Sequence, residues 1–209
     1  MDHEALWSAR YRDAGEDYLF GVGPNRYLAR HAELIRTGHT ALSVADGEGR
    51  NSVWLAEQGL AVTAVEISPV AVVKARKLAA GRQAEVNFAV ADILALDWPP
   101  PAFAEAFDWV VGIFIQFAGP DQRPAQFSAM KLATRPGGHV LLQGYTPEQL
   151  NFKTGGPSAV ENLYTPEMLH AAFADWHVEE LLVYEDDIAE GMAHKGRSAL
   201  IGLLARKPD

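Results

Sequence analysis

Apolar and polar positions follow one another in blocks along this chain, and the clearest series of blocks runs over residues 40–69. Short apolar runs bounded by turn residues predict buried strands, and a longer mixed run that stops at a glycine predicts a helix. The series reads as a strand, a turn, a helix and a second strand, at residues 41–45, 46–49, 50–58 and 60–65. Ser68 and Pro69 then begin another helix with a capping residue followed by proline. We therefore predict a β-turn-α-β unit here.

The same interpretation extends to the rest of the chain. Further strands are predicted at residues 86–91, 109–115, 139–143, 178–184 and 198–205, and further helices at residues 68–80, 121–134 and 165–173. Loops or turns are predicted at residues 95–106, 135–138 and 144–162, the last of them as an active-site loop. A short polar connection that contains Gly191, His194 and Gly196 joins the two closing strands, so we expect them to be antiparallel.

The first 38 residues are predicted to hold two helices, at residues 2–11 and 25–36. Trp7, Tyr11 and Tyr18 make this segment rich in aromatic side chains. Two interpretations stay open. The helices pack on the edge of a sheet, or they form a lid whose aromatic groups close over a bound cofactor.

The turn after the first strand carries the first chemical signal. Gly47 and Gly49 let a ligand approach the backbone closely, and the following helix presents its N-terminus to that ligand. Glu66 ends the next strand, where a carboxylate can accept hydrogen bonds from both hydroxyls of a ribose. Asp92 ends the third strand, so it reaches the same edge of a parallel sheet. These residues predict a site for a nucleoside-containing cofactor. Gly112, inside an apolar run, indicates a further close approach of a ligand.

Composition narrows the classes of function. The chain has 209 residues, enough for one domain with a substantial core, and no apolar run reaches the length of a membrane span. Cysteine is absent, which excludes disulfides, thiolate metal sites and cysteine nucleophiles. The seven histidines show no metal-ligand spacing, so no metal site is predicted.

Charge and the N-terminus give two further expectations. A formal net charge of −9 disfavours nucleic acid as a partner, and the basic cluster at residues 74–77 is interpreted as a solvated helix face. The polar N-terminus does not resemble a secretory signal, so we expect a cytoplasmic location and no membrane partner.

A dinucleotide cofactor is the main alternative to a mononucleoside. Dinucleotide-binding folds use three glycines in the pattern G-x-G-x-x-G, and the third glycine allows close packing around a pyrophosphate. In this chain Ser52 occupies the third position, and the turn lies some forty residues into the chain. An NAD(P)-dependent oxidoreductase therefore stays open as the second interpretation.

Five short motifs and the order of elements carry a resemblance to a known family. The motifs are W-x-x-R-Y at residues 7–11, F-G-x-G-P-N at 20–25, GEGRN at 47–51, RPGG at 135–138 and YTPEML at 164–169. In these the chain resembles class I S-adenosylmethionine (SAM) methyltransferases, most closely the small-molecule enzymes of the tellurite-resistance type. The resemblance implies a Rossmann-like α/β fold with a seven-stranded mixed sheet, an antiparallel C-terminal hairpin and helices on both faces. It implies one domain over residues 1–209, with a helical lid at 1–38 and a core at 39–209.

The resemblance also implies how SAM is bound. The glycine turn holds the methionine part, Glu66 holds the ribose, and Asp92 with Ile93 contacts adenine. The cofactor residues expected on this basis are Ala45, Asp46, Gly47, Gly49, Asn51, Glu66, Ile67, Asp92, Ile93 and Gly112.

Three residues depart from the family pattern. The family usually has an acid at the position of Ser43, a glycine at Ala45, and a small residue or cysteine at Asp46. The methyl group of Ala45 costs little if the turn keeps a negative φ. Asp46 is in a position to take over the contact to the SAM amino group that the missing acid normally makes or supports.

The expected reaction is methyl transfer from SAM to a small molecule, with a monomer or homodimer as the active form. A soft nucleophile such as a thiol, selenide or reduced tellurium species needs no protein base, whereas an oxygen or nitrogen nucleophile does. The polar candidates near the pocket are Tyr11, Gln116, Tyr145 and His194. The last is expected in a loop, where an exposed structural role competes with a role as base. A non-catalytic SAM-binding protein is the third interpretation, because the altered turn could reflect lost turnover.

Overall fold

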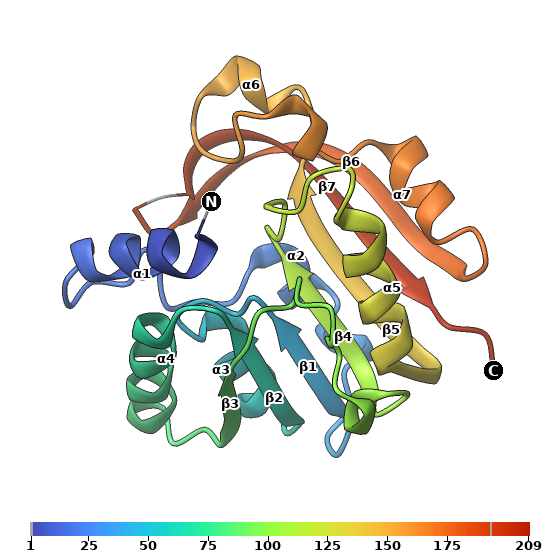
Figure 1. The fold of residues 1–209 in the computed structure, drawn as a ribbon, viewed down its shortest axis with the longest axis horizontal. Helices are drawn as coiled ribbons and strands as arrows, with labels where there is room; N and C mark the ends of the chain where they lie inside the picture. The colour runs from blue at the N-terminus through green and yellow to red at the C-terminus, as the bar shows by residue number, and fades with distance from the viewer. Residues whose placement is uncertain (1, 193) are drawn as a thin grey trace.

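Seven strands form one sheet in the order β3-β2-β1-β4-β5-β7-β6 in the computed structural model (Figure 1). The strands are β1 Thr40–Val44, β2 Ala61–Glu66, β3 Val86–Val90, β4 Phe107–Ile113, β5 Thr134–Tyr145, β6 His177–Glu190 and β7 His194–Arg206. The first five strands are parallel to one another, and β7 is antiparallel to both β5 and β6. This confirms the predicted seven-stranded mixed sheet with an antiparallel hairpin. The structure describes residues 2–192 and 194–209; Met1 and Ala193, which the predicted domain includes, lie outside the described residues.

Helices cover both faces of the sheet. The α-helices are α1 His3–Asp13, α2 Arg26–Arg30, α3 Arg50–Glu57, α4 Pro69–Gly81, α5 Arg123–Ala133, α6 Gln149–Phe152 and α7 Pro166–Ala172. Three short 3₁₀ helices lie at η1 Ala32–Leu34, η2 Pro101–Phe103 and η3 Val160–Asn162. Local signals explain several of these boundaries: Ser68 Oγ accepts a hydrogen bond from the amide of Ala71 at α4, and Thr165 Oγ1 accepts one from Met168 at α7.

The core is split by the sheet into two layers. On one face α5 and α7 pack against β4 and β5, with Phe127 and Leu169 in the same cluster as Val110 and Leu142. On the other face α2 and α3 cover the same strands through Leu28 and Leu55. Next to them α4 packs with α3 over β2 and β3. Because strand side chains alternate between faces, the apolar run of β4 serves both layers, as a central strand must.

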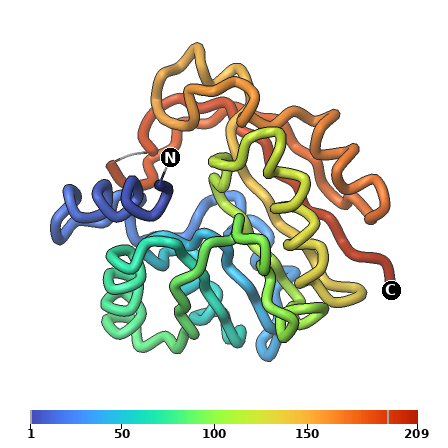
Figure 2. Tube along the Cα trace, viewed as in Figure 1, coloured from blue at the N-terminus to red at the C-terminus, as the bar shows by residue number. Residues whose placement is uncertain are grey.

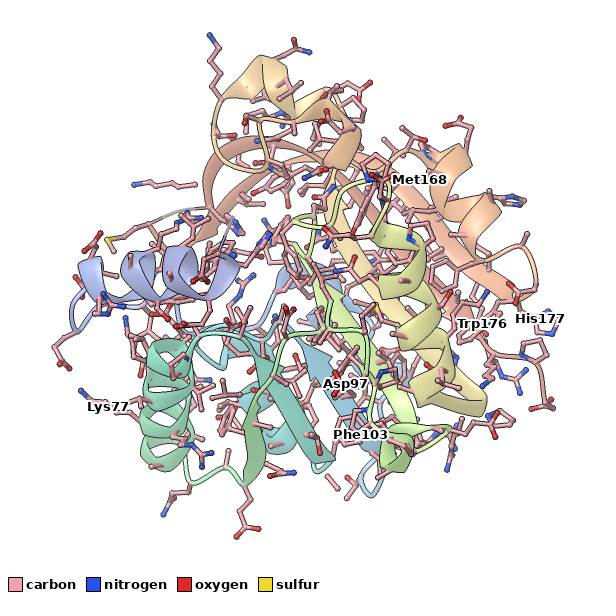
Figure 3. All side chains as sticks on the ribbon, viewed as in Figure 1. Lys77, Asp97, Phe103, Met168, Trp176 and His177 are labelled. Carbon is pink, nitrogen blue, oxygen red and sulfur yellow. The ribbon has the colours of Figure 1, made fainter. Side chains whose placement is uncertain are left out.

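Helix α1 lies apart from these layers, whereas α2 belongs to one of them. Figure 1 shows α1 beside the N-terminal end of α4, across the carboxyl edge of the sheet rather than along it. Ser8 and Ser68 are joined by a buried hydrogen bond between their hydroxyls, 2.8 Å apart. Lys77 projects outward from α4 (Figure 3) and pairs with Glu16 just after α1.

Basic side chains of α4 bind other segments of the same chain. Lys74 binds Glu48 at 2.5 Å and donates to the carbonyl of Asp17, and Arg76 donates to the carbonyl of Phe88. The cluster therefore ties α4 to the N-terminal segment and to β3 instead of forming a free basic patch.

Three sequence-based predictions were wrong in detail. The helix predicted at residues 25–36 breaks after Arg30, where His31 turns back to bond the carbonyl of Tyr27 through its side chain. Residues 135–138 continue β5 rather than forming a separate turn. The region at 144–162 contains α6 and η3, and none of its described residues lines the pocket defined below.

The closing hairpin differs most from the prediction. Strands β6 and β7 pair from His177 with Arg206 up to Glu190 with His194, so most of the predicted polar connection is strand. The polar residues at the end of β6 favoured a loop in the prediction, but they belong to an edge strand, where most charged side chains face solvent. Six acidic side chains lie along it, and charged edges are a common way for proteins to resist pairing with another sheet.

No helix among the described residues is long and apolar enough to cross a membrane.

Gly49 is expected to be essential for packing. It has φ +91°, and a Cβ added there would lie 2.9 Å from the Cβ and 3.0 Å from the Cα of Ala75 on α4. Gly49→Ala should therefore lower the free energy of unfolding by about 2–4 kcal/mol, from backbone strain and overpacking. Urea unfolding would measure this loss.

Gly81→Ala is the matched control, because no atom lies within 4 Å of a Cβ added there. It should change stability by less than about 1 kcal/mol. Equal effects of the two substitutions would contradict the packing role of Gly49.

Candidate active site

A pocket lies at the carboxyl edge of the parallel strands, where α/β sheets of this kind bind ligands. It encloses about 900 Å³, part of it open to solvent. The N-terminal segment, the turn after β1, the ends of β2, β3 and β4, and the start of β7 all contribute. The lining residues are His3, Trp7, Tyr11, Phe20, Gly21, Ala45, Asp46, Gly47, Glu48, Arg50, Asn51, Glu66, Ile67, Ala91, Asp92, Ile93, Leu94, Ile113, Phe114, Phe117 and His194.

Most residues expected from the sequence meet in this pocket. Those that line it are Ala45, Asp46, Gly47, Asn51, Glu66, Ile67, Asp92 and Ile93 from the expected cofactor set, and Tyr11 and His194 from the polar candidates. Gly49 and Gly112 do not line it, nor do Gln116 and Tyr145. A Cβ added at Gly112 would meet the ends of Ile115, Leu142 and Met130, so core packing accounts for this glycine.

Glu66 connects the ends of β1 and β2. Its Oε2 accepts a hydrogen bond from the amide of Gly47 at 3.0 Å, and its Oε1 accepts one from the amide of Ser68 at 2.9 Å. Burial raises the pKa of this carboxyl to about 7, although the two backbone amides act in the opposite direction. Each carboxylate oxygen can accept a second bond, so the group can also receive two hydroxyl donors from a ligand.

Asp46 replaces the usual small residue and turns toward its neighbours. Its carboxylate accepts hydrogen bonds from the hydroxyl of Ser43 at 2.7 Å, and from the hydroxyl and amide of Ser52 at 2.5 and 3.3 Å. Burial raises the pKa of Asp46, and these bonds oppose the rise. The acid absent at position 43 is thus present three residues later, bonded to Ser43 and to the first turn of α3.

The turn itself is more constrained than the sequence analysis assumed. Ala45 has φ +48°, so the condition of a negative φ at this position is not met. A left-handed alanine is strained by about 1–2 kcal/mol.

Gly47 also has a positive φ, and a Cβ added there would lie 2.9 Å from the hydroxyl oxygen of Tyr11. The missing side chain at Gly47 lets Tyr11 reach over the turn. Burial, then the charges of Glu66 and Glu48, raise the pKa of Tyr11, so its hydroxyl stays protonated.

His194 is buried at the start of β7, contrary to the loop position predicted for it. Its ring packs against Phe20 and Phe114, with ring centroids 4.6 and 4.4 Å away. Burial, assisted by the nearby charge of Arg50, lowers the pKa of His194 to about 3. The imidazole is therefore uncharged at neutral pH and is a poor proton acceptor.

Gln116 and Tyr145 lie behind the pocket. The amide group of Gln116 bonds both the N–H and the carbonyl of Tyr145, at 2.6 and 2.9 Å, and also the carbonyl of Asn162. Its hydrogen-bonding groups are thus used to hold the segment after β5. The ring of Tyr145 stacks under Phe114, with centroids 4.6 Å apart, and burial raises the pKa of its hydroxyl.

A buried ion pair closes the side of the pocket. Arg50 and Glu190 are both about 7% exposed, and their side chains meet at 2.7 Å. Glu190 also accepts hydrogen bonds from the side chain of Asn25 at 3.1 Å and from the amide of Arg26 at 3.2 Å. Asn51 accepts a bond from the amide of Asn25 at 2.9 Å. This junction joins α3, the tip of the hairpin and the segment before α2.

The N-terminal segment is anchored at the same end. Glu48 accepts a hydrogen bond from the amide of Leu19 at 2.7 Å and pairs with Lys74. The carbonyl of Leu19 in turn accepts a bond from the amide of Met192 in the hairpin. Figure 2 shows the blue N-terminal segment and the red hairpin side by side above the turn.

Several lining residues could not be predicted from the sequence. Arg50 and Glu48 were read only as parts of a motif, because their partners Glu190 and Lys74 lie far away in the chain. Phe114 and Phe117 follow β4 with no local signal of a site; the φ of +56° at Phe114 is visible only in the structure. Phe20 stood within a quoted motif, which was a usable signal.

Among the residues that the structure describes, no group of three His, Cys, Asp or Glu side chains is placed to hold a metal ion.

Comparison with known proteins decides the family. Residues 41–138 match the family model described as "Methyltransferase domain". The malonyl-[acyl-carrier protein] O-methyltransferase of Salmonella typhimurium is 32% identical over 224 residues, covering 95% of this chain and 85% of that protein. The chain belongs to the SAM-dependent methyltransferases. Its family cofactor is accordingly SAM, and the oxidoreductase interpretation is set aside.

Solved structures agree on the fold of this methyltransferase. A structure described as "Conversion of a Disulfide Bond into a Thioacetal Group during Echinomycin Biosynthesis" superposes with a TM-score of 0.80 at 19% identity, covering 98% of this chain and 92% of that one. TehB from Haemophilus influenzae has a TM-score of 0.71 at 18% identity, covering 98% and 66%. The first curated relatives that the chain matches are longer proteins, of which it spans about half, 51–54% of their length.

We propose that Glu66 receives the ribose hydroxyls of the cofactor, and its pKa then predicts how cofactor affinity changes with pH. The carboxyl is mostly neutral below pH 7 and ionised above it, and ribose hydroxyl donors bind the ionised form better. The dissociation constant for S-adenosylhomocysteine (SAH) should therefore rise about tenfold between pH 8 and pH 6. Calorimetric titration at several pH values would measure it.

Glu66→Gln should bind SAH at least tenfold more weakly at pH 8 and lose the pH dependence, since an amide oxygen does not titrate. Glu85→Gln, a change at an exposed glutamate, is the control and should behave as wild type. A pH dependence that survives in Glu66→Gln would contradict this assignment.

Proposed function

We propose that the chain transfers the methyl group of SAM to a small-molecule acceptor that attacks through a soft atom, such as the sulfur of a thiol. The observation that carries this proposal is the state of His194. It is the buried imidazole of the pocket, and it is uncharged with a pKa of about 3. His3 also lines the pocket, but it is only partly buried. An acceptor that needs a strong base at neutral pH is poorly served by His194. A thiol forms its thiolate without such help.

We infer the placement of the cofactor from the shape of the site. Glu66 keeps free acceptor capacity for the ribose hydroxyls, and Gly47 leaves the turn open for the methionine part. Ile93 offers a buried apolar contact for adenine, while Asp92 keeps an exposed carboxylate whose Oδ1 also accepts from the amide of Leu94. Asp46 lies beside the turn as the acid for the amino group.

SAM, when bound, supplies an electrophilic methyl group on a sulfonium. The task of the protein is then to hold the acceptor in line and to exclude water, and alignment alone can supply about 7–11 kcal/mol of the barrier. We assign the exclusion of water to the first part of the lid predicted at residues 1–38, because the later part, α2, packs on the sheet instead. Trp7, Tyr11 and Phe20 from this segment line the pocket, and Lys74 and Glu48 fix the segment in place.

Relatives and neighbours bear on the acceptor in different ways. The echinomycin structure is described as converting a disulfide into a thioacetal, which is chemistry at sulfur. The Salmonella relative is named an O-methyltransferase, so an oxygen acceptor is the competing class. The neutral His194 favours sulfur for this chain.

The pH dependence of turnover separates these acceptors. At saturating SAM, the rate with a thiol should rise with pH along the ionisation of that thiol, because no protein base is used. With benzenethiol and phenylmethanethiol, whose thiol pKa values differ, the midpoint of the profile should move with the acceptor. His194→Gln should leave both midpoints unchanged.

Two results would contradict the proposal. A midpoint that is the same for both thiols and disappears in His194→Gln would make the histidine a base. Binding of SAH with no methyl transfer to thiol, selenol, phenol or amine acceptors would favour a non-catalytic SAM-binding protein.

A further inference from the structure

Four rings from three distant parts of the chain line the pocket and contact one another. We call this set the aromatic wall: Trp7 and Phe20 from the N-terminal segment, Phe114 after β4, and His194 from β7. The inference below rests on the proposed function, since it concerns the acceptor of the same reaction.

The rings support one another through edge and tilted contacts. The centroids of Trp7 and Phe20 are 6.3 Å apart, those of Phe20 and His194 4.6 Å, and those of Phe114 and His194 4.4 Å. Aromatic pairs at 4.5–7 Å in tilted arrangements attract one another beyond simple burial. The wall is therefore a preformed surface rather than a set of loose side chains.

The backbone holds the central ring in an unusual way. Phe114 has φ +56°, a region that suits glycine, and its amide donates a hydrogen bond to the carbonyl of Gln143 at 2.8 Å. Non-glycine residues with strained backbone are concentrated at ligand sites. Tyr145 stacks against the ring of Phe114, and His194 meets the same ring in a T-shaped contact.

The wall carries no charge at neutral pH among its described side chains. Its imidazole is neutral, because burial and the charge of Arg50 oppose protonation. Arg50 also lines the pocket, but it is paired with Glu190. On the other side, the carboxylates of Asp46, Glu48 and Glu66 line the glycine turn. The guanidinium of Arg10 stacks over the ring of Trp7, 4.5 Å from its centroid, but Arg10 does not line the pocket. An anionic acceptor would therefore meet more carboxylates than cations among the lining residues, so an uncharged acceptor is favoured.

We propose that the acceptor is an uncharged aromatic molecule that carries the reacting thiol on or next to its ring. The ring stacks on the aromatic wall and the sulfur points to the methyl group. In the transfer, the thiolate sulfur forms a bond to the methyl carbon, the bond from that carbon to the sulfonium sulfur breaks, and its electron pair stays on that sulfur to give SAH. The thiol proton leaves to solvent before attack.

Product binding tests this independently of turnover. In the presence of saturating SAH, calorimetry would compare three probes: thioanisole, cyclohexyl methyl sulfide as its non-aromatic counterpart, and 4-(methylthio)benzoate as its anionic one. Thioanisole should bind about three- to tenfold more tightly than the cyclohexyl compound, the advantage expected from one or two aromatic contacts. The benzoate should bind more weakly than thioanisole.

Variants locate the effect on the wall. Phe114→Leu and Phe20→Leu should each reduce the preference for thioanisole over the cyclohexyl compound at least twofold, because leucine keeps apolar bulk without a ring. Phe152→Leu, on α6 and outside the pocket, should keep the full preference. Binding of SAH to each variant checks that the cofactor part is intact.

The outcomes are distinct from those of the proposed function. Equal binding of thioanisole and the cyclohexyl compound, or tightest binding of the benzoate, would overturn the aromatic acceptor even if some thiol is methylated. A failure to methylate any thiol would instead count against the proposed soft acceptor, while the preference among the three probes would still decide whether the wall selects aromatic rings.

Discussion

The pocket depends on one buried carboxylate, that of Glu190 at the tip of the hairpin. It is bonded at once by Arg50, by the side chain of Asn25 and by the amide of Arg26. Arg50 lies in the first turn of α3, 140 positions earlier in the chain, and Asn25 and Arg26 lie at the start of α2, 165 and 164 positions earlier. Burying such a pair costs desolvation that the extra hydrogen bonds must offset. Its main effect is geometric, because it fixes the hairpin against both the cofactor turn and the N-terminal segment.

The sequence was informative wherever the signal was local. The β-turn-α-β unit was predicted from its apolar runs and the turn residues between them. Ser68, Pro69 and Thr165 predicted helix starts where the structure has them. The parallel order of the first five strands followed from the alternation of helices and strands. The position of Glu66 at the end of β2 also followed, because it needed only the end of one strand.

The sequence failed where burial was decided at long range. His194 looked like an exposed loop residue because its neighbours are polar, yet Phe20 and Phe114 cover it from other parts of the chain. Ala45 was assumed to have an ordinary backbone, and nothing in a one-residue difference from glycine reveals a positive φ. Asp46 is an intermediate case. Its partners Ser43 and Ser52 are near in sequence, but their hydroxyls reach the carboxylate of Asp46 only in the folded turn.

Most of the aromatic wall lies outside the part of the chain that the family model matches. Residues 41–138 match the family model. This part of the chain contains the glycine turn, Glu66 and the end of β3. Trp7, Phe20 and His194 lie outside that part, on segments that reach the pocket from the two ends of the chain. Under the proposed role of the wall, changes in these flanking segments alter the choice of acceptor while the shared cofactor scaffold stays as it is. Segments outside a conserved scaffold can diverge in this way without disturbing the cofactor that the scaffold binds.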